Sequence, residues 1–181
     1  MRLVLVGGSL RKASLNTKFL RHLAKTLEGR GHSVVPFTGE ALRLPLYDAD
    51  LPGAPAAVTA LQAGLLEAGA LVIVSPEYNA GIPGHLKNAV DWVSTLEKSP
   101  WGGLPVLLCS ASPGAFGGAR GMLSWRATLA NMGAFVFPGS VNVPHADKNL
   151  DEEGAPTEAR TVSSLNHTLD AFLDFAAKLR A

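Results

Sequence analysis

The stretch LVLVGGS at residues 3–9 decides the fold of this chain. Four aliphatic residues in a row are typical of a strand buried on both faces, and the glycines after them indicate a tight loop. A helix is expected next, because Ser14 is a good N-cap and apolar residues recur at helical spacing from Phe19 to Leu27, just before Gly29. Such a strand, loop and helix typically begin a parallel α/β sheet.

The same alternation continues along the chain. Further strands are expected at 33–37, 70–75, 105–110 and 134–137, the last resuming at 140–143. Helices are expected at about 61–68, 83–94, 119–131 and 157–179, with an irregular, proline-containing connection at 39–55. Strands that alternate with helices pair in parallel through right-handed crossovers. The predicted fold is an α/β, three-layer α/β/α sandwich with a five-stranded parallel sheet of flavodoxin-like order 2-1-3-4-5, in a single domain over residues 1–181.

Composition narrows the function classes. The 181 residues are 47% hydrophobic and 17% charged, which argues against intrinsic disorder, and the formal charge of +1 favours neither nucleic acid nor an anionic membrane surface. The longest apolar runs are too short for a membrane span. A single cysteine, Cys109, and no signal sequence predict a cytoplasmic location.

Some residues invite a functional interpretation that the sequence does not favour. Cys109 lies in an apolar strand and is expected to be a core residue, and the five histidines lack metal-ligand spacing, so no metal site is predicted. Residues 151–153 read as a solvated acidic turn. Trp92, Trp101 and Trp125 could each belong to the core, although an exposed Trp101 beside Pro100 would suit a subunit contact.

Ligands of such sheets bind at the carboxyl ends of the strands, beside the point where the strand order reverses. The loop after the first strand, GSLRKASLN at residues 8–16, offers hydroxyls, a guanidinium and the N–H groups at the start of a helix. This mixture suits a single phosphate ester, because the stretch lacks both the Walker pattern and the dinucleotide pattern of glycines. The alternative is that the serines only cap the turn and helix while Arg11 and Lys12 are solvated.

Two further loops lie at the same edge of the predicted sheet. SPEYNAGIPG at residues 75–84 combines a stiff backbone with an aromatic ring and an amide, which could hold a planar heterocycle, or could simply form a proline-rich turn. SASPGAFGG at residues 110–118 has small side chains that allow close approach of a ligand to the backbone, although alone it is a flexible connection. Together the three loops predict one cleft with a phosphate seat and room for a flat ring.

These motifs resemble a known family. The pattern GSLRxxSxN at residues 8–16, PEYN at 76–79, LKNAVDW at 86–92 and GGAR at 117–120 closely resemble the NAD(P)H-dependent FMN reductases of flavodoxin-like fold, a group that includes quinone, chromate and azo-dye reductases. The run LPLYDAD at 44–50 extends the resemblance. His85 departs from the small or apolar residue expected there, and residues 144–156 match least well.

The resemblance implies an FMN site built from all three loops. It implies that the phosphate is held by Ser9, Arg11, Ser14, Leu15 and Asn16. It implies that the ribityl chain and isoalloxazine are lined by Pro76, Glu77, Tyr78 and Asn79. The far side of the ring would be lined by Ser110, Ser112, Pro113, Gly114 and Gly117.

The implied reaction needs no catalytic side chain, because the flavin N5 takes the hydride. NADPH or NADH would reduce FMN, and a quinone, a flavin or a similar acceptor would then reoxidise it in ping-pong turnover. The family also implies a homodimer or homotetramer. Two alternatives stay open: a flavodoxin-type electron carrier, which the near-neutral charge disfavours, and a flavin- or nucleotide-sensing protein without reductase activity.

Overall fold

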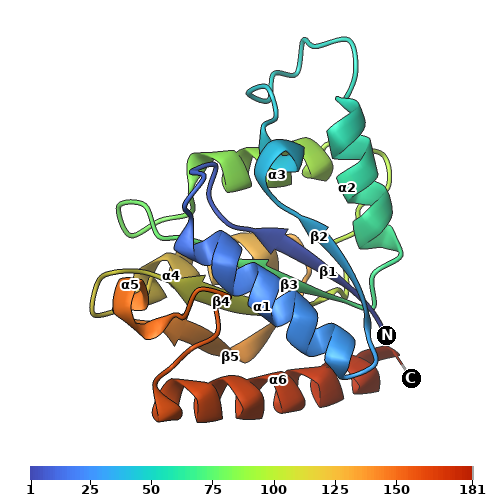
Figure 1. Cartoon of the computed structure of the whole chain (residues 1–181). Coiled ribbons are helices and arrows are strands. Elements are labelled where there is room, and N and C mark those ends of the chain that lie inside the picture. Colours follow the sequence, from blue (N-terminus) through green and yellow to red (C-terminus); the bar gives the residue numbers. More distant parts are fainter. Residues whose placement is uncertain (181) are drawn as a thin grey trace.

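A computed structural model describes residues 1–180 of the chain. Five parallel strands form one sheet in the order β2-β1-β3-β4-β5 (Figure 1). Their bounds are β1 Arg2–Gly7, β2 Ser33–Phe37, β3 Ala70–Val74, β4 Pro105–Ala111 and β5 Phe135–Val143. The predicted fold class and strand order are therefore confirmed.

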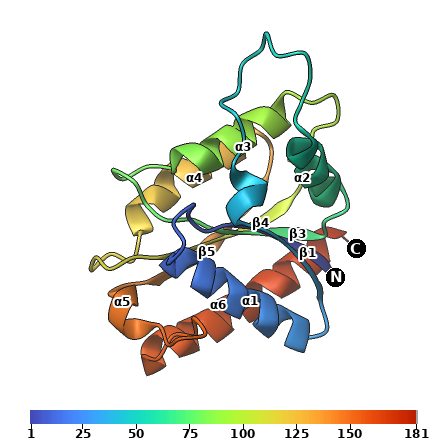
Figure 2. The same cartoon turned by 45° about the horizontal axis from the view of Figure 1, so that its top comes forward.

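Helices cover both faces of the sheet. One face carries α1, α5 and α6, and the other carries α2, α3 and α4 (Figure 2). Their bounds are α1 Leu15–Gly29, α2 Ala56–Leu66, α3 Gly84–Ser94, α4 Ala119–Asn131, α5 Ala146–Asn149 and α6 Ala159–Arg180, with a short 3-10 helix, η1, at Gly39–Leu42. No helix within residues 1–180 is both long enough and apolar enough to cross a bilayer.

Each face of the sheet has its own hydrophobic core. Strand residues alternate between the two, so that Leu3 and Leu5 of β1 pack with α1 and α6, whereas Val4 and Val6 pack on the α2, α3 and α4 side. Because β3 is buried along its whole length, its sequence is apolar at every position. Cys109 of β4 is fully buried, as predicted.

The structure decides between the two alternatives for Trp101 and corrects two sequence predictions. Trp101 is 3% exposed and belongs to the core on the α3 side, so it offers no surface for a subunit contact. The second helix begins at Ala56, immediately after Pro55, rather than at residue 61. The last strand is continuous through Pro138, because the register against β4 shifts there and Arg126 donates to the carbonyls of Phe137 and Pro138, at 2.8 Å each.

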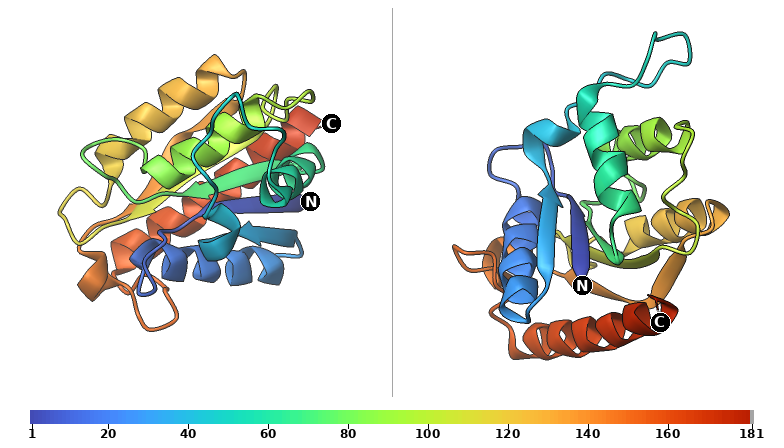
Figure 3. Two further views of the ribbon diagram at one scale, coloured as in Figure 1. Left: turned by 90° about the horizontal axis from the view of Figure 1, so that it is seen from above. Right: turned by 90° about the vertical axis from the view of Figure 1, so that its right-hand side faces the viewer.

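The connection between η1 and α2 projects from the body of the molecule (Figure 3). Its first part is fixed to α3 by Asn88, which donates to the carbonyl oxygen of Pro45 at 2.9 Å and accepts from the N–H of Tyr47 at 2.8 Å. The indole N–H of Trp92 also donates to the Pro45 oxygen, at 2.8 Å. The motifs at 44–50 and 86–92 are therefore two sides of one contact.

Candidate functional site

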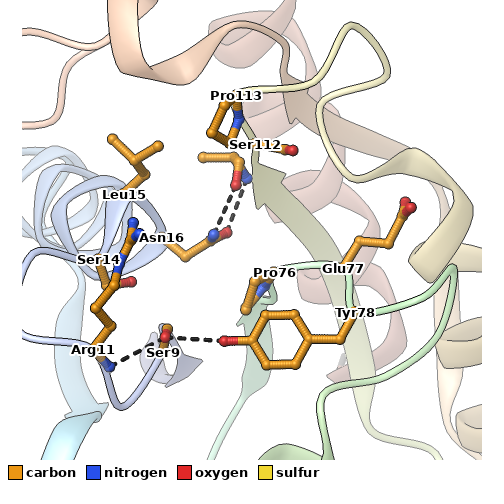
Figure 4. Close-up of a pocket in the computed structure, with 11 residues that line it drawn as sticks. Ser9, Arg11, Ser14, Leu15, Asn16, Pro76, Glu77, Tyr78, Ser112 and Pro113 are labelled. Carbon is orange, nitrogen blue, oxygen red and sulfur yellow. Dashed lines mark hydrogen bonds between the residues drawn. The ribbon is translucent and has the colours of Figure 1, made fainter.

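A cavity of about 220 Å³ lies where the carboxyl ends of β1, β3 and β4 meet (Figure 4). The close approach of these strand ends depends on Gly7, since a Cβ there would lie 2.0 Å from the carbonyl oxygen of Val74. Ala111 lines the cavity together with ten residues of the predicted FMN site: Ser9, Arg11, Ser14, Leu15, Asn16, Pro76, Glu77, Tyr78, Ser112 and Pro113. The other predicted residues, Asn79, Ser110, Gly114 and Gly117, do not line it.

One wall of the cavity is the start of α1. Ser14 caps the helix by accepting a hydrogen bond from the N–H of Thr17 at 3.1 Å. The N–H groups of Leu15 and Asn16, the first two of the helix, find no acceptor among the described residues. The free N–H groups, the positive end of the helix dipole and the exposed guanidinium of Arg11 make this wall suited to an anion.

Asn16 joins this wall to the end of β4. Its side chain is 4% exposed, donates to the carbonyl oxygen of Ala111 at 2.7 Å and accepts from the Ala111 N–H at 2.9 Å (Figure 4). Both polar atoms of the amide are therefore engaged in holding two loops together. What Asn16 can offer an anion in the cavity is its backbone N–H.

Tyr78 reaches across the cavity from the loop after β3. Its hydroxyl lies 3.1 Å from the Ser9 hydroxyl oxygen, and the N–H of Arg11 donates to the same oxygen at 3.2 Å (Figure 4). The backbone turns sharply between Tyr78 and Gly81, with Asn79 and Ala80 at φ of 52° and 60°. Asn79 therefore lies at the exposed tip of a turn, outside the cavity.

The carboxylate of Glu77 points away from Tyr78 and toward α4 (Figure 4). Its Oε1 accepts from Nε and Nη2 of Arg120, at 2.9 and 2.7 Å, and its Oε2 accepts from the N–H of Gly121 at 3.1 Å. Since Gly118, the N-cap of α4, has no side chain, Glu77 supplies the acceptor at this helix start. The 9% exposed side chain of Glu77 thus joins the loop after β3 to α4.

Ser110, near the end of β4, holds the glycine-rich loop that follows it. Its buried hydroxyl donates to the carbonyl oxygen of Gly117 at 2.5 Å and accepts from the side-chain amide of Asn142 at 2.7 Å. A Cβ at Gly117, where φ is 58°, would lie 2.8 Å from the carbonyl carbon of Val143. Asn142 was not among the predicted site residues. Its place near the carboxyl end of the last strand could have indicated it, because ligands of such sheets bind at these strand ends.

A comparison with protein families accounts for this arrangement of loops. Residues 1–148 match the family model described as NADPH-dependent FMN reductase. The chain belongs to this family. As an FMN reductase family member it is an oxidoreductase that uses FMN with a reduced nicotinamide nucleotide as co-substrate.

Curated relatives cover nearly the whole chain. A quinone reductase of Escherichia coli strain K12 is 36% identical over 189 aligned positions, which include 99% of this chain and 97% of the relative. An NAD(P)H-dependent FMN reductase of Pseudomonas aeruginosa is 30% identical over 179 positions, covering 97% and 95% of the two chains. The FMN reductase family therefore includes full-length relatives of this protein.

Solved structures agree with the sequence comparison. The flavoenzyme NAD(P)H:(acceptor) oxidoreductase FerB of Paracoccus denitrificans superposes with a TM-score of 0.86 at 31% identity, covering 98% of this chain and 97% of that one. A flavodoxin mutant of Pseudomonas aeruginosa matches with a TM-score of 0.56 at 17% identity over the full length of both chains. The second likeness shows the flavodoxin-like fold alone.

Proposed function

We propose that this FMN reductase family member passes hydride from NADPH or NADH, through bound FMN, to a quinone, a flavin or a similar small acceptor. The observation that carries the proposal is the cavity wall at the start of α1. There the free N–H groups of Leu15 and Asn16, the hydroxyl of Ser9 and the guanidinium of Arg11 converge on one space without a facing carboxylate, since Glu77 is engaged with α4. A phosphate dianion needs such converging donors to replace its hydration.

The residues of the site fit FMN better than a larger nucleotide. A cavity of about 220 Å³ is smaller than the roughly 300–1,000 Å³ of typical ligand pockets, so it would suit the phosphate end of the cofactor, with the ring outside it. Bound FMN supplies the hydride-accepting centre. The side chains of this chain bind and orient: Arg11 neutralises the phosphate charge, and Asn16 and Glu77 hold the loops on either side.

Ping-pong turnover is part of the proposal. The flavin ring would lie at the mouth of the cavity between the ends of β1, β3 and β4, so the nicotinamide and the acceptor would approach it through the same opening in turn. The names of the curated relatives, among them several quinone reductases, support a quinone as acceptor. Initial rates measured against both substrates should give parallel double-reciprocal lines, whereas converging lines would contradict alternation.

Two accompanying features belong to the same proposal. A homodimer or homotetramer is supported by two large apolar side chains that stay exposed near the start of α4, Phe116 at 67% and Leu123 at 70%. Analytical ultracentrifugation of the purified protein would reveal a monomer if this is wrong.

A cytoplasmic location stays a prediction, based on the lone Cys109.

The decisive experiment compares Arg11→Ala with Lys12→Ala. Both residues are exposed cations of the same loop, but only Arg11 lines the cavity. We expect Arg11→Ala to weaken FMN affinity by at least tenfold, because a charge-assisted contact to phosphate is lost, while Lys12→Ala changes it little. FMN binding by the wild type without NAD(P)H oxidation in the presence of quinone would instead favour an electron carrier or a sensor.

A further inference from the structure

His85, in the first turn of α3, lies beside the loop that follows β1. Its Nε2 is 3.3 Å from the carbonyl oxygen of Gly8, although the two residues are 77 positions apart. A carbonyl oxygen can only accept, so Nε2 must carry the hydrogen and donate it. Burial lowers the pKa of His85 below its usual value, which favours the neutral ring, and the hydrogen bond to Gly8 opposes that effect in part.

The Gly8 carbonyl belongs to the peptide unit that it shares with Ser9. No peptide bond among residues 1–180 is cis, so the C=O of Gly8 and the N–H of Ser9 point in opposite directions. Since the C=O faces His85, the N–H of Ser9 faces away from it. That N–H has no acceptor within the described residues, and Ser9 lines the cavity.

This peptide unit needs an external restraint. Gly8 has φ of 84° and, lacking a side chain, has access to backbone conformations in which the unit is rotated. The N–H of Gly8 is fixed by the carbonyl oxygen of Val74 at 2.8 Å, but that bond holds the preceding peptide. A rotated Gly8–Ser9 unit would turn a carbonyl oxygen toward the anion seat, where it would repel a phosphate.

We propose that His85 is a positioning residue for the phosphate seat, which it orients by holding the Gly8 carbonyl so that the N–H of Ser9 stays available to the anion. This inference rests on the proposed binding of FMN at the start of α1. His85 itself makes no contact with the phosphate in this arrangement. Its effect should therefore depend on the hydrogen-bond donor at Nε2 and on the presence of the phosphate group in the ligand.

The test compares His85→Leu, which removes the donor, with His85→Gln, which keeps an N–H donor on a side chain of similar reach. His32→Leu is the control, because His32 immediately precedes β2 and so lies at the amino ends of the strands, away from the cavity at their carboxyl ends. Affinities for FMN and for riboflavin, which lacks the phosphate, are measured by quenching of flavin fluorescence. Far-UV circular dichroism and thermal unfolding establish that each variant is folded.

We expect His85→Leu to weaken FMN binding by about tenfold and to change riboflavin binding by less than about twofold, with His85→Gln recovering most of the loss. The Ser9 amide resonance should shift on FMN addition in the wild type and shift less in His85→Leu. Equal weakening for both flavins, or unchanged FMN affinity, overturns the role of His85. A wild type that binds neither flavin overturns the proposed function itself.

Discussion

Asn16 and Ala111 are 95 positions apart and are joined by two hydrogen bonds, one from the side-chain amide to the backbone oxygen at 2.7 Å and one from the backbone N–H to the amide oxygen at 2.9 Å. This pair fixes the distance between the start of α1 and the end of β4. The two halves of the cavity wall are thus held together before any ligand arrives, which lowers the cost of ordering them on binding.

Asn16→Ala should therefore affect both stability and cofactor binding. The substitution leaves the N–H and C=O of Ala111 without partners in a buried site, and we expect the free energy of unfolding to fall by about 1–3 kcal/mol. FMN affinity should fall as well, because the two walls separate. Urea unfolding and flavin titration measure the two effects. Exposed Asn131, at the end of α4, is the control, and equal losses in Asn131→Ala would contradict this role for Asn16.

Glu77→Gln should loosen the contact between the loop after β3 and α4. The carboxylate loses its charge toward Arg120 and Gly121, and we expect a loss of about 1–2 kcal/mol, reduced by the exposure of Arg120. A matched acid–arginine pair is Glu40 with Arg43, in which Glu40 is 87% exposed. Glu40→Gln should change stability by less than about 0.5 kcal/mol. Similar unfolding curves for the two variants would count against the bridging role of Glu77.

The fold was predictable because its local signals agree with one another. The apolar run of β3 and the proline and glycine that bound α3 and α4 point to the same elements as the tertiary packing does. Long-range contacts escaped prediction. Nothing local to Pro138 shows that Arg126 satisfies the carbonyls of a bulge there, and nothing local to Trp101 shows that core residues cover it.

For the candidate site too, local sequence predicted the loops but not the long-range contacts between them. The loops were identified from residue types, and most of the predicted residues meet around one cavity. The sequence could not distinguish residues that line the cavity from those that support it. Ser110 and Glu77 carry polar groups suited to a ligand, yet Ser110 is engaged with the backbone of Gly117 in the glycine-rich loop and Glu77 with the backbone of Gly121 in the first turn of α4. Such pairings depend on distances that only the folded chain defines.

Cys109 should be chemically inert in the folded protein. Complete burial in β4 raises the pKa of its thiol to about 12, so at pH 8 the reactive thiolate is absent as well as shielded. We expect no reaction with Ellman's reagent at pH 8 in buffer and one equivalent of thiol per chain in 6 M guanidinium chloride, since the chain has one cysteine. Rapid labelling of the native protein would show that β4 opens readily.

Stability should fall as the pH drops below about 6.5. Burial is the main cause that lowers the pKa values of His22, His32 and His85 below the ordinary value of 6.5. Below pH 6.5 the unfolded chain then binds more protons than the folded chain, so the stabilising contribution is fully present above pH 6.5 and is lost as the pH falls from 6.5 through the lower folded pKa values. The pKa of Glu153 is lowered from 4.5 by its hydrogen bond to Lys25, so this carboxylate reduces the stability only when the pH falls below about 4.5.

Urea unfolding at pH 7.5 and pH 5.5 measures this dependence. The free energy of unfolding should be smaller at pH 5.5, and His22→Gln should reduce the difference between the two values, because one of the groups that takes up a proton on unfolding is then missing. His22 suits this purpose better than His85, since it lies on α1 away from the cavity and its replacement leaves the proposed anion seat intact. An identical difference in the wild type and the variant would show that His22 does not contribute.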